Sequence, residues 1–556
     1  MSEEPKADQP QSGHVNSEAD AHQKMVRGSA WMTAGSLFSR ILGAIYIIPW
    51  VMWLGSNSMQ GNALYAKGYN IYSFFLLVAI GGIPSAISKQ ISEYNAINEY
   101  GVGQRLFKRG LLLAGAMGIA SGAILWFGAQ PIALIFGGGD PHVIPVLRAL
   151  AIALVIIPPM ALMRGFFQGY QQMAPSAVSQ FVEQVFRVVY MLAATYFIMR
   201  IQNGNWVNAI TQSTFAAFIG AAASCLLLGW YYYRQRPELN RLAAQSEAKL
   251  VIPVWQLFKD IIVQAIPFIV IDTATTVFNL LDQATFQPIM QATFHIKVES
   301  INTLYALFAF NSNKLVMIIV SLASAIAITV VPLLSESLAA QNLRNIRQQL
   351  EDAIILFLFI MIPGALGMAA VAQPLNTLFY GYDQTGAVIL QIAAFTAIIL
   401  GLFTVVSALM QGLSRNRDVI RFYLIGLGVK LVLQWPCIVL LSAAGPLVAT
   451  AIGMLVASLL ILHDLEVNFG VRYVKLLPKI NRILMYSIVT YVAAKVAVYG
   501  LNLIFNEQRQ TQALIILLIA VAIGGGVYVY FALRSRLADI MIGAKADGLR
   551  RKLRIK

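Results

Sequence analysis

Apolar residues gather into long runs that short polar connections separate. A helix needs about 20 apolar residues to cross a bilayer, and about fourteen runs meet that length. They cover approximately residues 29–54, 64–88, 107–128, 143–166, 176–200, 210–233, 259–284, 303–332, 353–372, 385–411, 419–441, 446–464, 483–505 and 512–533. Membrane β-barrels instead have short segments of alternating polarity. The pattern predicts an all-α polytopic membrane protein.

The composition supports this class. Of the 556 residues, 58% are hydrophobic and 12% are charged, whereas charged residues make up about 25% of a typical soluble domain. Residues 1–28 are mostly polar and lack the features of a signal peptide, so we predict a disordered cytoplasmic tail. Cys225 and Cys437 both lie in apolar runs, which indicates neither a disulfide nor a metal site.

Basic residues alternate between the two sides of the predicted membrane. The even-numbered connections carry Lys89, Arg105, Lys108, Arg109, Arg234, Arg236, Arg241, Lys249, Lys259, Arg344, Arg347, Arg415, Arg417, Arg421, Arg472, Lys475, Lys479 and Arg482. The odd-numbered connections have only Lys67, Arg148, Arg200, Lys297 and Arg509 at or near them. Positive charge favours the cytoplasmic side, so we predict that both termini, including the basic tail 535–556, are cytoplasmic. This dispersal over short loops argues against nucleic-acid binding.

An internal repeat with an offset of 243 residues divides the chain. It relates Gln130 to Gln373, Gln168 to Gln411 and Arg187 to Lys430, and we also match Pro84 with Pro332. We therefore predict two six-helix bundles, 29–233 and 259–466, related by a pseudo-twofold axis along the membrane normal, with the substrate site between them. Residues 234–258 form the cytoplasmic linker, 467–534 are two appended helices, and 335–353 is expected to be an amphipathic surface helix.

Two cations inside the apolar runs have no evident acidic partner. Arg40 lies near the middle of its run with no acid within four residues, and Lys314 ends a polar patch that begins at Asn311. An ionisable group at such depth is costly and usually faces a cavity or a partner. Arginine can hold phosphate oxygens bidentately and lysine acts as a point charge. We therefore predict that both bind a phosphate-bearing substrate, although each could instead bond carbonyls within a packed bundle.

The other intramembrane ionisable groups allow more than one interpretation. Arg187 could pair with Glu183 four residues earlier, and Lys430 could bond carbonyls or pair with Asp272 across the bundle. The candidate substrate-binding set is Arg40, Lys314, Arg187, Lys430, Asn313 and Gln180, and the candidate ion-coupling residues are Asp272 and Glu183. Asp282, near the outer end of its run, is expected to be solvated, and Lys495 to serve packing or lipid contact.

The sequence lacks the usual signatures of covalent chemistry. Gly137 to Asp140 is not followed by the GK[ST] of a phosphate-binding loop, and neither HExxH nor GxSxG occurs. We predict no catalytic residue, no metal and no cofactor, and hence secondary transport rather than an enzyme.

Three short motifs resemble those of the MurJ lipid II flippases of the MOP exporter superfamily. They are FSRILG at 38–43, GIPSAISKQISE at 82–93 and VVPLLSES at 330–337. The resemblance covers about residues 25–535 and is strongest to the Gram-positive polysaccharide-biosynthesis and stage V sporulation-like branch. It implies a V-shaped pair of bundles that moves a lipid-linked pyrophosphate precursor to the outer leaflet, with the lipid tail beside the last two helices.

The resemblance also bears on individual residues and on partners. Arg40 falls on the first-helix arginine of the family and Lys314 falls at or beside its eighth-helix arginine, whereas Tyr46 stands where many members have a second arginine. It further implies a monomer in a Gram-positive plasma membrane, with cell-wall synthesis enzymes as candidate partners. Other undecaprenyl-linked saccharides, such as a teichoic acid or capsule unit, remain alternative substrates. A drug antiporter and a membrane glycosyltransferase are weaker alternatives, because the interior is basic and no Asp-x-Asp is present.

Overall fold

The computed structural model describes residues 42–43, 45–246, 254–539 and 545–552, and the regular secondary structure in these ranges is entirely helical. The first part of the chain contains α2 (Ile47–Leu54), η1 (Gly55–Asn57), α3 (Ser58–Ile80), α4 (Ile83–Ala96), α5 (Tyr100–Phe127), α6 (Ala129–Phe136), α7 (Val143–Gly169), α8 (Met173–Tyr196), η2 (Phe197–Ile201) and α9 (Trp206–Ala244). The second part contains α10 (Val254–Phe294), α11 (Val298–Ala306), η3 (Leu307–Ser312), α12 (Asn313–Ala339), α13 (Leu343–Ala370), α14 (Ala372–Tyr380), α15 (Gln384–Gly412), α16 (Asn416–Leu441), η4 (Ser442–Ala444) and α17 (Gly445–Phe469). The helices α18 (Tyr473–Asn502), α19 (Gln510–Arg534) and α21 (Lys545–Lys552) follow.

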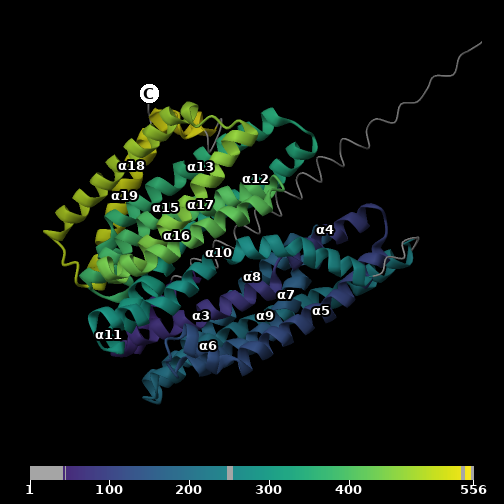
Figure 1. Cartoon of the computed structure of the whole chain (residues 1–556), viewed down its shortest axis with the longest axis horizontal. Coiled ribbons are helices and arrows are strands. Elements are labelled where there is room, and N and C mark those ends of the chain that lie inside the picture. The colour runs from purple at the N-terminus through teal and green to yellow at the C-terminus, as the bar shows by residue number, and fades with distance from the viewer. Residues whose placement is uncertain (1–41, 44, 247–253, 540–544, 553–556) are drawn as a thin grey trace, which may run out of the picture.

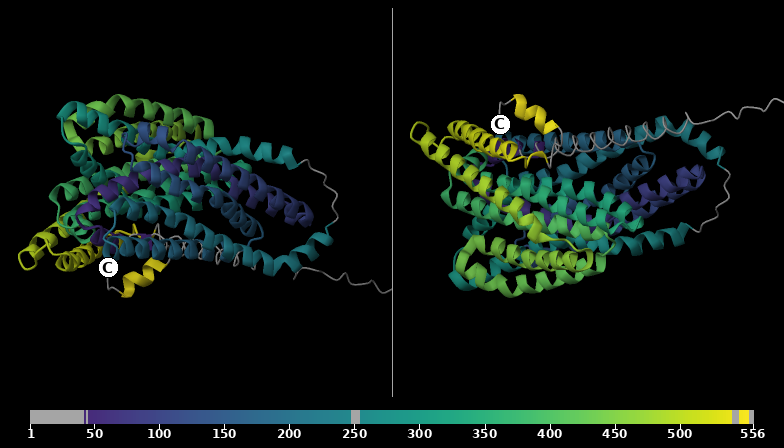
Figure 2. Two further views of the ribbon diagram at one scale, coloured as in Figure 1. Left: turned by 90° about the horizontal axis from the view of Figure 1, so that it is seen from below. Right: turned by 90° about the horizontal axis from the view of Figure 1, so that it is seen from above.

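These helices form two lobes that meet at one end and diverge at the other (Figure 1). The N-terminal lobe consists of α2 to α9 and the C-terminal lobe of α10 to α17. The end that carries α11 is called the closed end below, and the end that carries α4 is called the splayed end. The long helix α10 joins the lobes, because it packs on both α16 and α3. Two further views show the helices from below and from above (Figure 2).

The lengths and composition of the helices confirm the predicted fold class. Eleven segments of the described residues are long and apolar enough to cross a membrane. The segment Ile47–Ile80 includes both α2 and α3, and the segment Asn416–Phe469 includes both α16 and α17. Helix α10 is a further long helix, of 41 residues. The chain is thus an all-α polytopic membrane protein, and this arrangement is consistent with fourteen crossings.

The sequence repeat has a direct counterpart in the helices. The first residues of α5, α6 and α8 stand 243 positions before those of α13, α14 and α16, and the last residues of α7 and α15 have the same offset. Even the left-handed turn residues correspond, since Gln171 and Ser414 have φ values of 58° and 59°. Each half therefore repeats a long helix, a short helix and two more long helices.

The repeat register of the helices before α5 and α13 differs from the sequence prediction. A Cβ added to Gly169 would contact Ile91 and the carbonyl oxygen of Ser88. A Cβ added to Gly412 would contact Leu334 and the carbonyl oxygen of Val331. Ser88 and Val331 are 243 residues apart, so matching Pro84 with Pro332 was wrong. Proximity of the motifs to helix ends had suggested that match, but helix packing fixes the register.

Two predicted segments also have different bounds. The second apolar run was placed at 64–88, but α3 begins at Ser58 and ends before Gly81 and Gly82, where Gly82 adopts a φ of 68°. This conformation favours glycine and starts α4 in a new direction. The predicted surface helix 335–353 is not a separate element, because α12 continues through Ala339 and α13 begins at Leu343.

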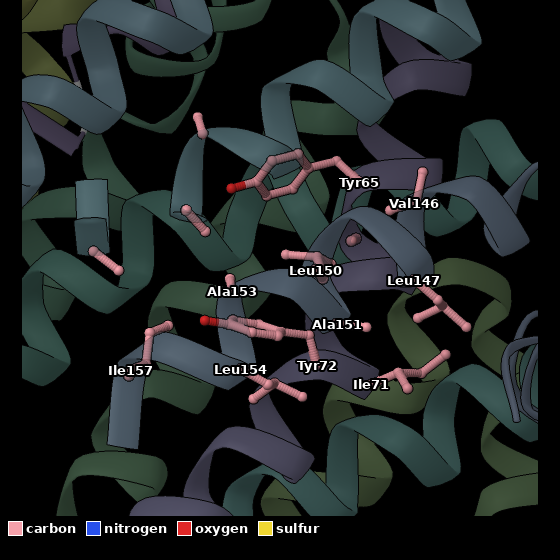
Figure 3. Close-up of a cluster of buried hydrophobic side chains, with 14 of the residues drawn as sticks. Tyr65, Ile71, Tyr72, Val146, Leu147, Leu150, Ala151, Ala153, Leu154 and Ile157 are labelled. Atoms are coloured by element: carbon pink, nitrogen blue, oxygen red, sulfur yellow. The ribbon is translucent and has the colours of Figure 1, made fainter. Parts of the chain in front are cut away.

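Close helix packing anchors α3 within the N-terminal lobe. Tyr65, Ile71 and Tyr72 of α3 are buried against Val146, Leu150 and Leu154 of α7 (Figure 3). A Cβ on Gly68 would lie 2.3 Å from Val146 Cγ1, so the two helices touch at this glycine. This packing fixes which face of α3 remains for the other lobe.

The last two long helices attach to the C-terminal lobe. Ile355 and Phe359 of α13 pack with Leu476 and Ile483 of α18, and α19 packs against α14. The Tyr528 hydroxyl of α19 also donates a hydrogen bond of 2.8 Å to the Phe359 carbonyl. These helices leave the interlobe contacts unobstructed (Figure 1).

Candidate interlobe anion site

Polar side chains join the two lobes at the closed end. Asn62 Nδ2 of α3 donates a hydrogen bond of 2.8 Å to Asn311 Oδ1 of η3. Gln60 Nε2 lies 3.3 Å from Thr303 Oγ1, a residue 243 positions later. Equivalent positions of the two halves therefore meet here, as expected on a pseudo-twofold axis.

A cluster of aromatic rings and cations lies beside these contacts. Lys314 Nζ is 5.4 Å from the ring centroids of both Tyr65 and Tyr69, and 5.6 Å from that of Phe310. The guanidinium carbon of Arg187 is 5.3 Å from the Tyr69 centroid. We call these five residues the interlobe cation cluster. In this cluster, Lys314 of the C-terminal lobe and Arg187 of the N-terminal lobe both lie close to the ring of Tyr69 of α3.

No acid among the described residues forms an ion pair with the cations of the cluster. Among the described residues, neither Lys314 nor Arg187 lies within ion-pair distance of a carboxylate. Tyrosine rings attract cations through their negative faces, but each such contact contributes only about 0.5–2 kcal/mol. The pair therefore retains the capacity to bind an anion. The π-helical turn η3 ends two residues before Lys314, and such turns often occur at functional sites.

Arg187 does not make the ion pair that its spacing suggested. Glu183 Oε2 instead accepts a hydrogen bond of 2.7 Å from Arg164 Nη2 of α7. The same guanidinium donates to Ser179 and Ser224 at 2.8 and 2.9 Å. Sequence reasoning omitted Arg164, although its position at the end of an apolar run marked it as another intramembrane cation.

Lys430 bonds a backbone carbonyl, as one of the two predicted alternatives has it, and it also pairs with an acid other than Asp272. Its Nζ lies 2.9 Å from Asp282 Oδ1 and donates to the Phe278 carbonyl at 2.6 Å and to Thr450 Oγ1 at 2.7 Å. Lys430 is fully buried and Asp282 is only 6% exposed. Asp272 is exposed and does not take part, so both the Lys430–Asp272 pairing and the solvation of Asp282 were wrong. Lys430 has the repeat position of Arg187, yet its charge is balanced.

A small cavity with several polar groups in its lining lies mainly within the C-terminal lobe. Its volume is about 60 Å³, and its polar lining includes Asn70, Asn313, Asp282, Tyr305 and Thr450. Asn70 and Asn313 are equivalent in the repeat and come from opposite lobes. Water could occupy a cavity of this size and polarity.

The remaining candidate residues lie at different places in the chain. Arg40 lies outside the described residues. Gln180 is half-buried on α8, the helix that carries Arg187. Lys67, predicted to lie at or near a connection, is well inside α3 and is 3% exposed. The described residues contain no group of three His, Cys, Asp or Glu side chains that could hold a metal ion.

Comparison with known proteins identifies the family. The family model "Polysaccharide biosynthesis protein" matches residues 25–338, and the model "MatE" matches residues 309–435. The lipid II flippase MurJ of Bacillus subtilis (strain 168) is 33% identical over 541 residues, which cover 95% of this chain and 98% of that protein. The chain belongs to the MurJ family of the MOP exporter superfamily.

Solved structures agree with the MurJ fold. A lipid II flippase MurJ in an inward closed conformation has a TM-score of 0.64 at 15% identity, covering 92% of this chain and 99% of that one. An inward-facing multidrug resistance MATE transporter has a TM-score of 0.58 at 12% identity, covering 78% and 94%. Membership of the MurJ family makes this multi-pass membrane protein a transporter and not an enzyme.

Proposed function

We propose that this protein is a flippase for lipid II, the lipid-linked peptidoglycan precursor, and that the interlobe cation cluster binds its pyrophosphate. The observation that carries the proposal is that Lys314 and Arg187, from opposite lobes, meet at Tyr69 without a carboxylate partner among the described residues. A pyrophosphate would supply the missing negative charge and could accept charge-assisted hydrogen bonds from both side chains. The similarity to the Bacillus subtilis flippase supports lipid II as the substrate.

The other candidate residues fit this site to different degrees. Arg40 remains a proposed ligand because its sequence position matches the first-helix arginine of the family. Asn313 and Gln180 are proposed to contact the polar headgroup, since both are half-buried near the cluster's helices. Lys430 is a poorer candidate, because Asp282 already balances its charge.

Of the two candidate ion-coupling residues, we propose this role only for Asp272. Its carboxylate is exposed within the long helix α10, which contacts both lobes. Glu183 is less suitable, since Arg164 already holds it in an ion pair. A proton or another cation at Asp272 would alter the charge of α10 where it joins the lobes.

We propose alternating access as the mechanism, with the splayed end facing the cytoplasm. The N-terminal ends of α5, α16 and α18 lie toward that end and carry basic residues, including Arg105, Arg415 and Lys475. Such charge favours the cytoplasmic side. The headgroup would enter between the lobes there, and loss of the hydrogen bonds at the closed end would release it outside. The lipid tail would remain beside α18 and α19.

The boundaries of the functional units follow this scheme. We assign the two moving lobes to 29–233 and 259–466, the linker to 234–258 and the tail-binding helices to 467–534. We further propose a monomer in a Gram-positive plasma membrane with both termini inside, with cell-wall synthesis enzymes as candidate partners.

Purified protein in liposomes tests the substrate and the site together. Wild-type protein should flip lipid II, while Arg40→Ala, Lys314→Ala and Arg187→Ala should each lower its affinity or rate by about tenfold or more, the loss expected for one charge-assisted contact. Lys108→Ala is the matched control, because this lysine is exposed on α5 and has no place in the proposed site. Full activity of both Lys314→Ala and Arg187→Ala would remove the cluster from the mechanism.

Rescue of a strain that lacks its own lipid II flippase separates the candidate substrates. Rescue supports lipid II. Failure to rescue, combined with transport of an undecaprenyl-linked teichoic acid or capsule unit, would favour that alternative, and export of cationic drugs would favour an antiporter.

A further inference from the structure

Lys67 is a buried cation at the lobe interface that the interlobe cation cluster does not include. Its Nζ donates a hydrogen bond of 2.8 Å to Asn302 Oδ1 of α11 and lies 5.9 Å from the Tyr305 ring centroid. Both partners belong to the C-terminal lobe, whereas Lys67 belongs to α3. The backbone carbonyl of Lys67 also accepts a hydrogen bond of 3.1 Å from Gln283 Nε2 of α10.

The partners of this ammonium group are neutral. Among the described residues, no carboxylate lies within ion-pair distance of Lys67. Asp140, on the neighbouring connection, attracts the ammonium group from a longer distance, and its Oδ1 lies 2.9 Å from His142 Nδ1. Burying a charge without an opposite charge in contact with it is unfavourable. The closed arrangement of the lobes therefore keeps Lys67 in an unfavourable environment that opening would relieve.

The location of Lys67 relates it to the path of the substrate. It is two residues before Tyr69 on a helix that runs from the closed end to the splayed end, so it lies about 3 Å closer to the closed end. Asn302 and Tyr305 would move away with the C-terminal lobe if this end opened. The ammonium group would then face the opening, beyond Lys314 and Arg187.

We propose that Lys67 is a second anion-binding station, which Asn302 and Tyr305 cover in the closed state and which receives the pyrophosphate when the closed end opens. This inference rests on the proposed function for the identity of the anion. The interlobe cation cluster binds the anion between the lobes, and Lys67 binds it on the exit side. Lys67 then contributes to transport without contributing to initial binding.

Substitutions separate this role from that of an interlobe latch. The amide introduced by Lys67→Gln could still hydrogen bond Asn302 but has no charge, whereas Asn302→Ala removes the hydrogen bond and keeps the charge. We expect Lys67→Gln to slow lipid II transport about tenfold with binding to the closed state unchanged, Lys67→Arg to retain transport, and Asn302→Ala to retain it too. Normal transport by Lys67→Gln, or equal losses in Lys67→Gln and Asn302→Ala, would overturn the proposal.

Amine-reactive labelling of the full chain in lipid nanodiscs tests the station without relying on transport. Mass spectrometry should show modification of Lys67, and inorganic pyrophosphate should slow it severalfold while leaving the exposed Lys297 unaffected. Absence of Lys67 modification, or equal rates with and without pyrophosphate, would count against the station. Protection by pyrophosphate but not by lipid II would support the station and contradict lipid II as the substrate.

Discussion

Lys430 and Asp282 form a fully buried ion pair, with 2.9 Å between Nζ and Oδ1, between helices α16 and α10. The pair ties the bridging helix α10 to the C-terminal lobe. Thr450 and Gln434 complete its hydrogen bonds, since Thr450 Oγ1 lies 3.1 Å from Asp282 Oδ2 and Gln434 Nε2 lies 2.9 Å from Oδ1. A buried charge pair with this many partners is expected to be sensitive to the loss of either member.

Asp282→Asn should therefore destabilise the protein strongly. It leaves the Lys430 ammonium group buried without its counter-charge, and we expect the free energy of unfolding to fall by about 3–5 kcal/mol. The double variant Asp282→Asn/Lys430→Met should recover much of that loss, because it removes both charges. Denaturant unfolding in detergent measures these differences, and Asp272→Asn on the same helix is the exposed control. Equal stability of the Asp282→Asn and Asp272→Asn variants would contradict a stabilising pair.

Tyr69 should influence substrate affinity through its ring. Lys314 and Arg187 lie 5.4 and 5.3 Å from its centroid, so the ring helps to hold both cations near each other. Tyr69→Leu should weaken lipid II binding by about 2- to 30-fold, the range expected from one cation–π contact. Tyr69→Phe keeps the ring and should bind nearly as well as wild type. Titration of lipid II into purified protein provides the comparison, and similar affinities for both variants would argue against a role of the ring.

Gly220 should tolerate no side chain, because α8 and α9 touch there. A Cβ at this position would lie 2.5 Å from the Glu183 carbonyl oxygen and 3.0 Å from Arg187 Cβ. Gly220→Ala should lower the free energy of unfolding by about 1–3 kcal/mol, as overpacking does in other cores, and should displace Arg187. Gly229→Ala is the control on the same helix, since a Cβ added there would have no neighbour within 4 Å. A thermal unfolding experiment in which both variants match wild type would disprove this contact.

The membrane potential should accelerate transport of the anionic headgroup. Lys314 and Arg187 are fixed to helices, so the charge that crosses the membrane is that of the substrate. An inside-negative potential favours outward movement of negative charge by about 2.3 kcal/mol per net charge per 100 mV. Liposomes with a potassium gradient and valinomycin should flip lipid II faster when the side corresponding to the cytoplasm is negative. A rate that does not change with the sign of the potential would show that another step or ion carries the charge.

Local properties of the chain were sufficient to predict the helical membrane fold. The cost of burying polar backbone in lipid forces each long apolar run into a helix, so run length gave the helices and the offset of 243 residues gave the repeat of α5–α8 in α13–α16. The exceptions are at helix ends. Gly81 and Gly82 break an apolar run that hydropathy treats as continuous. The predicted run 64–88 was consequently displaced toward the C-terminus, which put Lys67 near its first residue although Lys67 lies well inside α3.

The partners of the intramembrane charges depended on tertiary structure. Sequence spacing put Glu183 beside Arg187, but close packing at Gly220 turns α8 so that Glu183 meets Arg164 and Arg187 meets Tyr69. Likewise, Asp282 is 148 residues from Lys430, and only the contact between α10 and α16 unites them. The sequence by itself determined which apolar runs contain charged residues, because the runs follow from local hydropathy, but it did not determine the burial of each charge, since Asp282 and Lys67 are buried against expectation. Only the tertiary structure decided which of those charges are neutralised, because an ion pair requires two helices to present their charged faces to each other.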